Sequence, residues 1–145
     1  MLYDPLNSVV QLCVKGIETE YSGDLEKAHA LYQEAWDLAN TELEFFTAAH
    51  YLARVQTEPA ASLHWNLLAL ENARKTDHPD LTAAYPSLYL NVGKSYEDLG
   101  NVPEANDYYL LALSHAKDLA DDGYNQMIRK GILAGLDRLK ERLRQ

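Results

Sequence analysis

Apolar residues recur along this chain at intervals of three and four, which is the period of a helix that buries one side. Short polar stretches and glycine or proline residues interrupt the pattern and divide the chain into seven expected helices. Their approximate ranges are 6–21, 24–39, 42–55, 59–75, 79–98, 103–120 and 124–143. Pro86 falls inside the fifth range, and we expect it to kink or divide that helix because proline lacks an amide hydrogen. The sequence therefore predicts an all-α fold.

A spacing pattern recurs three times along the chain. A small residue is followed twelve residues later by Ala, then after four more by an aromatic residue, and after three more by a small or aliphatic one. The sets are Gly16, Ala28, Tyr32, Ala35; Ala49, Ala61, Trp65, Leu68; and Gly93, Ala105, Tyr109, Ala112. Gly23 and Gly100 follow where the first helix of a pair must end. The pattern predicts stacked helical hairpins, in which each hairpin buries its apolar side against a neighbour.

The segments GDLEKAHALYQEAW (23–36) and YLNVGKSYEDLGNVPEANDYYLLAL (89–113) resemble tetratricopeptide repeats. The longer step between the second and third sets, together with DHPDL (77–81), resembles the repeats of the kinesin light chain type. This resemblance implies a right-handed α-α superhelix of three hairpins, at about 8–41, 42–76 and 79–118. A capping helix at about 124–144 would complete a single domain spanning residues 1–145. Members of this family bind other proteins, so the resemblance also implies a scaffold or adaptor.

The resemblance places the first helix of each hairpin along a concave, partner-binding side. The residues expected there are Cys13, Ile17, Tyr21, Phe46, Thr47, His50, Arg54, Asn91, Lys94 and Asp98. Some family members clamp the C-terminal carboxylate of chaperones with lysine, asparagine and arginine side chains. The corresponding positions here hold Cys13, Ile17, Thr47, Ser87 and Asn91, so we expect a peptide or protein partner but no such clamp.

The last expected helix carries an apolar stripe that has two interpretations. Ile132, Leu136, Leu139 and Leu143 lie at intervals of four and three, and so share one side. Repeat arrays need a terminal element that covers the last exposed apolar face, which favours a capping helix. The alternative is self-association through this stripe, as in a homodimer.

Motifs for catalysis or metal binding are not evident. No two of the five histidines are four residues apart as in a helical zinc site, and Cys13 is the only cysteine. The sequence has no glycine-rich phosphate loop and no GxSxG motif. The acidic run at 118–123 lacks the ligand spacing of a calcium loop, so we interpret it as a helix cap. We expect no enzyme activity, no cofactor and no metal, although a small-molecule sensor stays an alternative.

The charge distribution narrows the choice of partner. A net charge of −9 argues against nucleic acid and against an anionic membrane surface. Residues 129–145 carry six basic and two acidic groups, a net of +4, which leaves −13 on the rest. A single cysteine fits a reducing compartment, and neither a signal peptide nor an apolar run of about 20 residues is present. We therefore expect a cytoplasmic protein.

Overall fold

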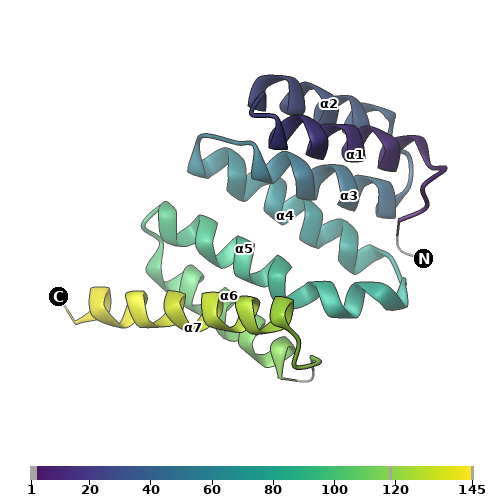
Figure 1. The fold of residues 1–145 in the computed structure, drawn as a ribbon. Coiled ribbons are helices and arrows are strands. Elements are labelled where there is room, and N and C mark those ends of the chain that lie inside the picture. Colours follow the sequence, from purple (N-terminus) through teal and green to yellow (C-terminus); the bar gives the residue numbers. More distant parts are fainter. Residues whose placement is uncertain (1–2, 118, 145) are drawn as a thin grey trace. The chain divides into compact units, whose positions relative to one another are not determined.

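The computed structural model describes residues 3–117 and 119–144, and this part of the chain is all helical (Figure 1). The helices are α1 (Ser8–Tyr21), α2 (Leu25–Leu38), α3 (Glu42–Arg54), α4 (Pro59–Lys75), the 3₁₀ helix η1 (Pro79–Ala84), α5 (Tyr85–Asp98), α6 (Val102–Ala116) and α7 (Gly123–Leu143). The all-α prediction is confirmed. The predicted division at Pro86 is confirmed as well, because η1 precedes α5 and Pro86 lies in the first turn of α5.

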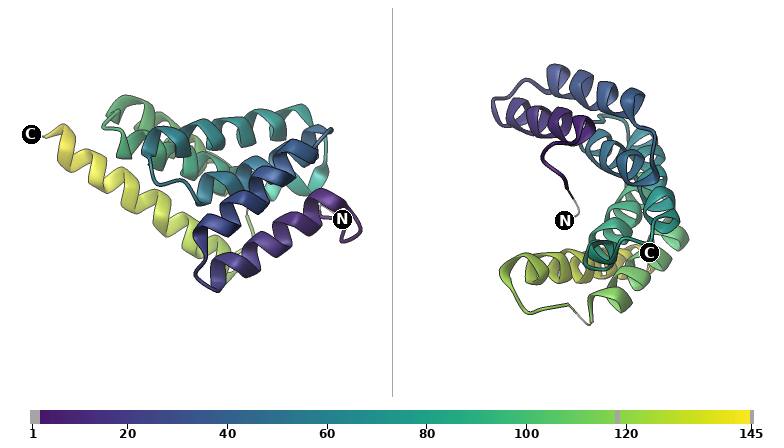
Figure 2. Two further views of the ribbon diagram at one scale, coloured as in Figure 1. Left: turned by 90° about the horizontal axis from the view of Figure 1, so that it is seen from above. Right: turned by 90° about the vertical axis from the view of Figure 1, so that its right-hand side faces the viewer.

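The described helices form two compact units, Met1–Asp80 and Leu81–Gln145, which we call unit 1 and unit 2. In unit 1, α1 pairs with α2 and α3 pairs with α4, while α3 also packs against α2 and α1 (Figure 2). In unit 2, α5 pairs with α6, and α7 packs against both of them. Met1, Leu2, Asp118 and Gln145, which belong to the expected domain and repeat ranges, lie outside the described residues.

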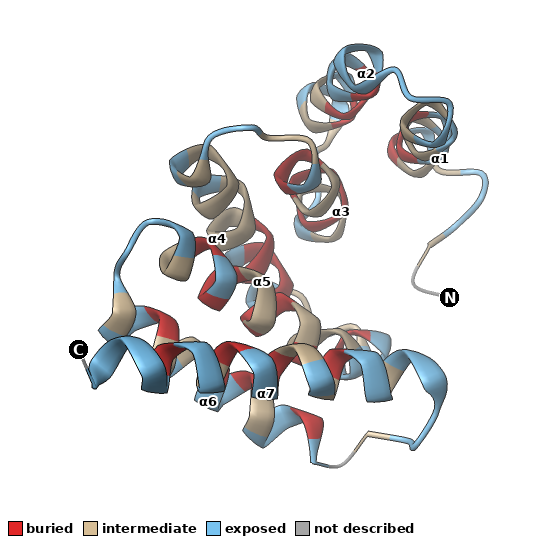
Figure 3. Ribbon diagram, turned by 60° about the vertical axis from the view of Figure 1, so that its left-hand side comes forward, coloured by how far each residue is buried: buried red, intermediate tan, exposed pale blue. Residues whose placement is uncertain are grey.

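The first and third copies of the predicted pattern lie in the cores of unit 1 and unit 2. In unit 1, the buried residues of α1, α2 and α3 face one another (Figure 3). Gly16 is so close to Tyr32 that an added Cβ would overlap the ring, and Gly93 has the same relation to Tyr109. Ala28, Tyr32 and Ala35 are fully buried, as are their counterparts Ala105, Tyr109 and Ala112. The first and third copies of the pattern thus describe the same packing of a small residue under an aromatic ring.

Two glycines end α1 and α5 in the same way. Gly23 and Gly100 have φ values of 92° and 80°, a region that favours glycine because it lacks a Cβ. At the end of α1, the Gly23 amide donates to the Glu20 carbonyl and the Asp24 amide donates to the Thr19 carbonyl. The same pair of bonds recurs at Gly100 and Asn101. These are Schellman turns, and they set the positions at which α2 and α6 begin.

The second copy of the pattern is less buried than the other two. Ala49 is fully buried, whereas Ala61, Trp65 and Leu68 on α4 are only half-buried. Trp65 lies edge-on to Trp36, with ring centroids 5.0 Å apart, and Trp36 also contacts Phe45. In the first hairpin the equivalent residues of α2 pack against α3. Within unit 1 no further helix follows α4.

Candidate functional site

Each unit contains a cluster of one glutamate, one tyrosine and one arginine, which we call the Glu–Tyr–Arg cluster. In unit 1, the Tyr32 hydroxyl donates to Glu20 at 2.5 Å, and Arg54 of α3 donates to the other Glu20 oxygen at 3.2 Å. In unit 2, Glu97 accepts from the Tyr109 hydroxyl at 2.7 Å and from Arg138 of α7 at 2.9 and 3.0 Å. The cluster therefore attaches α3 and α7 to the hairpin that precedes each of them.

The glutamate of the unit 2 cluster is held in its charged form. The hydrogen bond from Arg138 is the main reason that the pKa of Glu97 falls to about 2, and the bond from Tyr109 adds to the effect. The same contacts work in the opposite direction on the tyrosine, because burial and the negative charge of Glu97 raise the pKa of Tyr109. The Glu97 carboxylate, the Tyr109 hydroxyl and the Arg138 guanidinium bind one another across three helices, which indicates a structural role.

Next to its buried side, α1 carries an apolar stripe. The stripe consists of Val10, Val14, Ile17 and Tyr21, at intervals of four, three and four residues. Tyr21 is 84% exposed and Val14 is 48% exposed, whereas Val10 and Ile17 are half-buried. A narrow stripe with this spacing is the seam that one helix offers to another. We call this surface the α1 stripe.

The structure divides the residues predicted for the partner surface into three groups. Tyr21, Arg54, Lys94 and Asp98 are exposed, although Lys94 and Asp98 form an ion pair with each other at 2.7 Å along α5. Ile17, His50 and Asn91 are half-buried. Cys13, Phe46 and Thr47 are each only 2% exposed, which corrects their predicted place on an open surface.

The local surroundings of Cys13 and Thr47 explain this difference. Cys13 belongs to the core cluster of unit 1, where burial raises the pKa of its thiol to about 12. The Thr47 hydroxyl donates to the Leu43 carbonyl one turn earlier and so needs no outside partner. Both side chains therefore lie inside unit 1.

His50 lies in an aromatic environment on α3. Its ring stacks with that of Phe46 at 6.1 Å and meets the Tyr51 ring edge-on at 5.0 Å. Its Nδ1 is buried and has no hydrogen-bond partner among the described residues. Burial lowers the pKa of His50 to about 4, and the positive charge of Arg54 contributes. The imidazole is therefore neutral at physiological pH.

The apolar stripe predicted for the last helix is turned mainly inward. Ile132 and Leu139 are fully buried, Leu136 is half-buried, and only Leu143, at 65% exposed, lies open to solvent. Because α7 packs against α6 and α5, this stripe covers the hairpin of unit 2. Ile132 and Leu139 thus have no free surface with which to contact a second copy of the chain.

The acidic run before α7 provides the N-cap of that helix. Asp122 is the capping residue, because its side chain accepts a hydrogen bond from the Asn125 amide at 2.8 Å.

Two features of the site were missed by reasoning from the sequence. Val14 lies four residues after Val10 and three before Ile17, so helical spacing alone could have placed it on the stripe. The Glu–Tyr–Arg clusters also had a signal, because a glutamate follows both Gly16 and Gly93 by four residues. The arginine that completes each cluster comes from the next helix at unequal distances along the chain, so spacing could not reveal it.

No family model matches this chain, and no curated protein matches it in sequence. Among residues 3–117 and 119–144, no three histidine, cysteine or acidic side chains come together as metal ligands. None of the described helices has both the length and the apolar character needed to cross a bilayer. The arguments about function therefore rest on the surfaces themselves.

Proposed function

We propose that this protein is an interaction module of tetratricopeptide type, which binds a helical segment of another protein on the α1 stripe. The observation that carries the proposal is the apolar seam of Val10, Val14, Ile17 and Tyr21, which lies beside the buried side of α1 and exposes Val14 and Tyr21. The role is binding rather than catalysis. The reduced, buried Cys13 fits a reducing compartment, and we place the module in the cytoplasm.

The α1 stripe has the composition of a recognition surface. Tyr21 offers a large amphipathic ring, a side chain that is common among the anchors of protein interfaces. Val14 and Ile17 are stiff at χ1, so ordering them on binding costs little side-chain entropy. A partner helix with its own apolar stripe would bury these groups side by side, as two helices of a coiled coil do.

The rest of unit 1 holds the stripe in place before a partner arrives. Gly16 packs under Tyr32, and Glu20 binds both Tyr32 and Arg54, so α1 is attached to α2 and α3 along its inner side. Asn7, which caps α1, also donates to Glu44 of α3 at 2.7 Å. Such preorganisation reduces the entropy lost on association, because the backbone of the binding surface is already ordered.

Photo-crosslinking in the native cell tests the proposal. A photoreactive phenylalanine analogue replaces Tyr21 in the full chain, and the expected result is a discrete crosslinked protein identified by mass spectrometry. Introducing Val14→Glu into the same chain should abolish the crosslink without lowering the thermal unfolding midpoint, because Val14 is half exposed.

Leu38 on α2 provides the matched control, since it is 52% exposed and lies outside the stripe. The analogue at Leu38 should not capture the same protein. Equal capture from both positions, or a Tyr21 crosslink that survives Val14→Glu, would show that the α1 stripe is not the binding surface.

A further inference from the structure

Unit 2 contains a continuous row of five aromatic rings along α5 and α6, which we call the aromatic row. Its order is Tyr85, His115, Tyr89, Tyr108 and Tyr96. Successive ring centroids are 5.8, 5.1, 6.2 and 5.6 Å apart. The rings come alternately from the two helices, so they interleave along the hairpin.

The aromatic row is more open than the core that lies beside it. Tyr109, the core tyrosine of the same hairpin, is fully buried, and Tyr89 is 6% exposed. In contrast, Tyr85, Tyr96 and Tyr108 are half-buried and His115 is exposed. Four of the five rings thus keep accessible surface.

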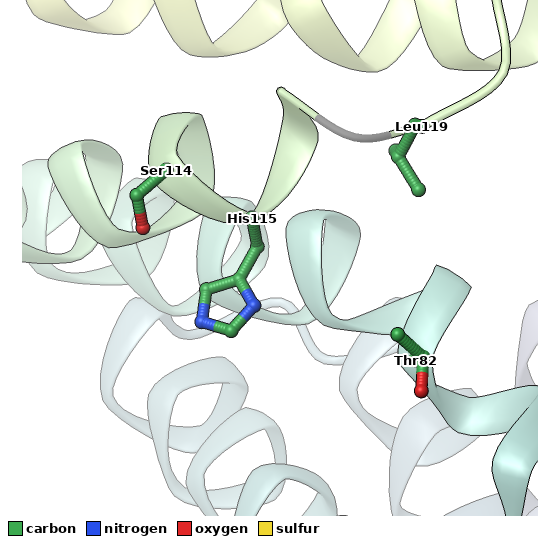
Figure 4. A pocket seen from close by; sticks show the side chains of 4 residues that line it. All are labelled: Thr82, Ser114, His115 and Leu119. Atoms are coloured by element: carbon green, nitrogen blue, oxygen red, sulfur yellow. The ribbon is translucent and has the colours of Figure 1, made fainter.

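One end of the row opens into a pocket with a volume of about 310 Å³. Thr82, Ser114, His115 and Leu119 line it, and all four belong to unit 2. Figure 4 shows His115 and Ser114 on α6, Thr82 on η1, and Leu119 beyond the end of α6. His115 belongs to both the pocket and the row, so the two form one surface.

The other end of the row is acidic. Glu104 lies on α6 four residues before Tyr108, so the carboxylate and the Tyr108 ring share one face of the helix at the Tyr96 end of the row. Glu104 is itself exposed. A ligand lying along the row would therefore meet a pocket at the His115 end and a negative charge at the Tyr96 end.

We propose that the aromatic row binds a proline-rich segment that carries a basic residue, and that this surface is separate from the α1 stripe. Prolines of a polyproline II helix pack against tyrosine rings, and the stiff segment loses little entropy on binding. Tyr85 and Tyr96 are eleven residues apart on α5, about 16 Å. That distance matches about five residues of polyproline II. The pocket accepts a proline ring or small side chain, while Glu104 pairs with the basic residue.

Titration of the ¹⁵N-labelled full chain with a synthetic peptide tests this proposal. The peptide has proline at every third position and an arginine at one end, and the comparison peptide has alanine in place of each proline. We expect saturable shifts at Thr82, Tyr108 and His115 with the proline peptide only. The double variant Tyr108→Ser/His115→Ala should weaken binding about tenfold or more.

Control variants separate loss of binding from loss of folding. Leu110→Ala changes an exposed residue of α6 outside the row and should leave the affinity unchanged. Val14→Glu, on the α1 stripe, should also leave it unchanged, so failure of one proposal is distinguishable from failure of the other. Shifts that spread evenly over the chain, or equal binding of the alanine peptide, would overturn the assignment. A neutral oligosaccharide that saturates the same residues when the peptide does not would overturn it too.

Discussion

Gly16 and Gly93 each lie under a tyrosine ring of the following helix, and this contact decides how closely the two helices of a hairpin approach. An added Cβ at Gly93 would lie 2.9 Å from Cδ1 of Tyr109, whose ring is fully buried and also packs against Gly135 of α7. Any larger residue at these positions must therefore displace the ring or separate the helices.

We expect Gly93→Ala to destabilise the protein by about 1–3 kcal/mol, the usual cost of overfilling a packed core. The measurement is the free energy of unfolding from urea titrations. Gly123→Ala is the matched control, because a Cβ at this first residue of α7 meets nothing within 4 Å. The control should be neutral or slightly stabilising, and an equal loss in both variants would contradict the packing argument.

The Glu–Tyr–Arg cluster of unit 2 gives a second prediction at the residue scale. Glu97→Gln keeps the shape of the side chain but removes the charge that binds Arg138 and Tyr109. We expect a loss of about 1–2 kcal/mol, reduced by solvent screening because Arg138 is 46% exposed. Thermal unfolding measures it. Glu141→Gln breaks an exposed pair with Arg144 and should cause no measurable change.

At the scale of helices, α7 takes the position in unit 2 that α3 takes in unit 1. Each is the third helix, packs against the preceding hairpin, and donates an arginine to the glutamate of that hairpin. Unlike α3, α7 has no following partner helix among the described residues. The helix α7 thus covers the end of unit 2 with its buried side, which includes Ile128, Ile132 and Leu139.

Covering the hairpin with α7 should contribute strongly to stability. Leu139 is fully buried, so we expect Leu139→Ala to cost about 2–4 kcal/mol through lost burial and a residual cavity. Leu143, 65% exposed on the same helix, is the control, and Leu143→Ala should leave the unfolding midpoint in urea unchanged. Similar midpoints for both variants would mean that α7 is not held against α5 and α6.

The helices were predictable from sequence because their signals are local. Apolar spacing located them, and Gly23, Gly100 and Pro86 marked where they end or divide. Burial of the second repeat pattern was not predictable, since it depends on whether another helix covers α4. Side-chain direction within a helix follows from spacing, because each residue turns the helix by about 100°. Val14 therefore lies on the exposed stripe, while Cys13, its neighbour, belongs to the core.

For the molecule as a whole, acid should weaken the fold through at least two groups. His50 has a pKa of about 4, below its ordinary 6.5, so the folded state favours the neutral ring. The stability that depends on this ring is lost as the pH falls from about 6.5 towards 4. Glu97 has a pKa of about 2 instead of 4.5, so its contribution is present above about 4.5 and is lost as the pH falls towards 2.

Comparing the wild type with Glu97→Gln isolates the Glu97 contribution, because the effect of His50 is common to both proteins and cancels. At about pH 6 the wild type should be the more stable, since its carboxylate is charged and bound to Arg138. The difference in unfolding free energy should shrink as the pH drops below about 4.5, because a protonated carboxyl resembles the glutamine amide in charge. Urea titrations of both proteins at about pH 6, 4 and 3 measure this. A difference that stays constant over the range would mean that the charge of Glu97 does not attach α7 to its hairpin.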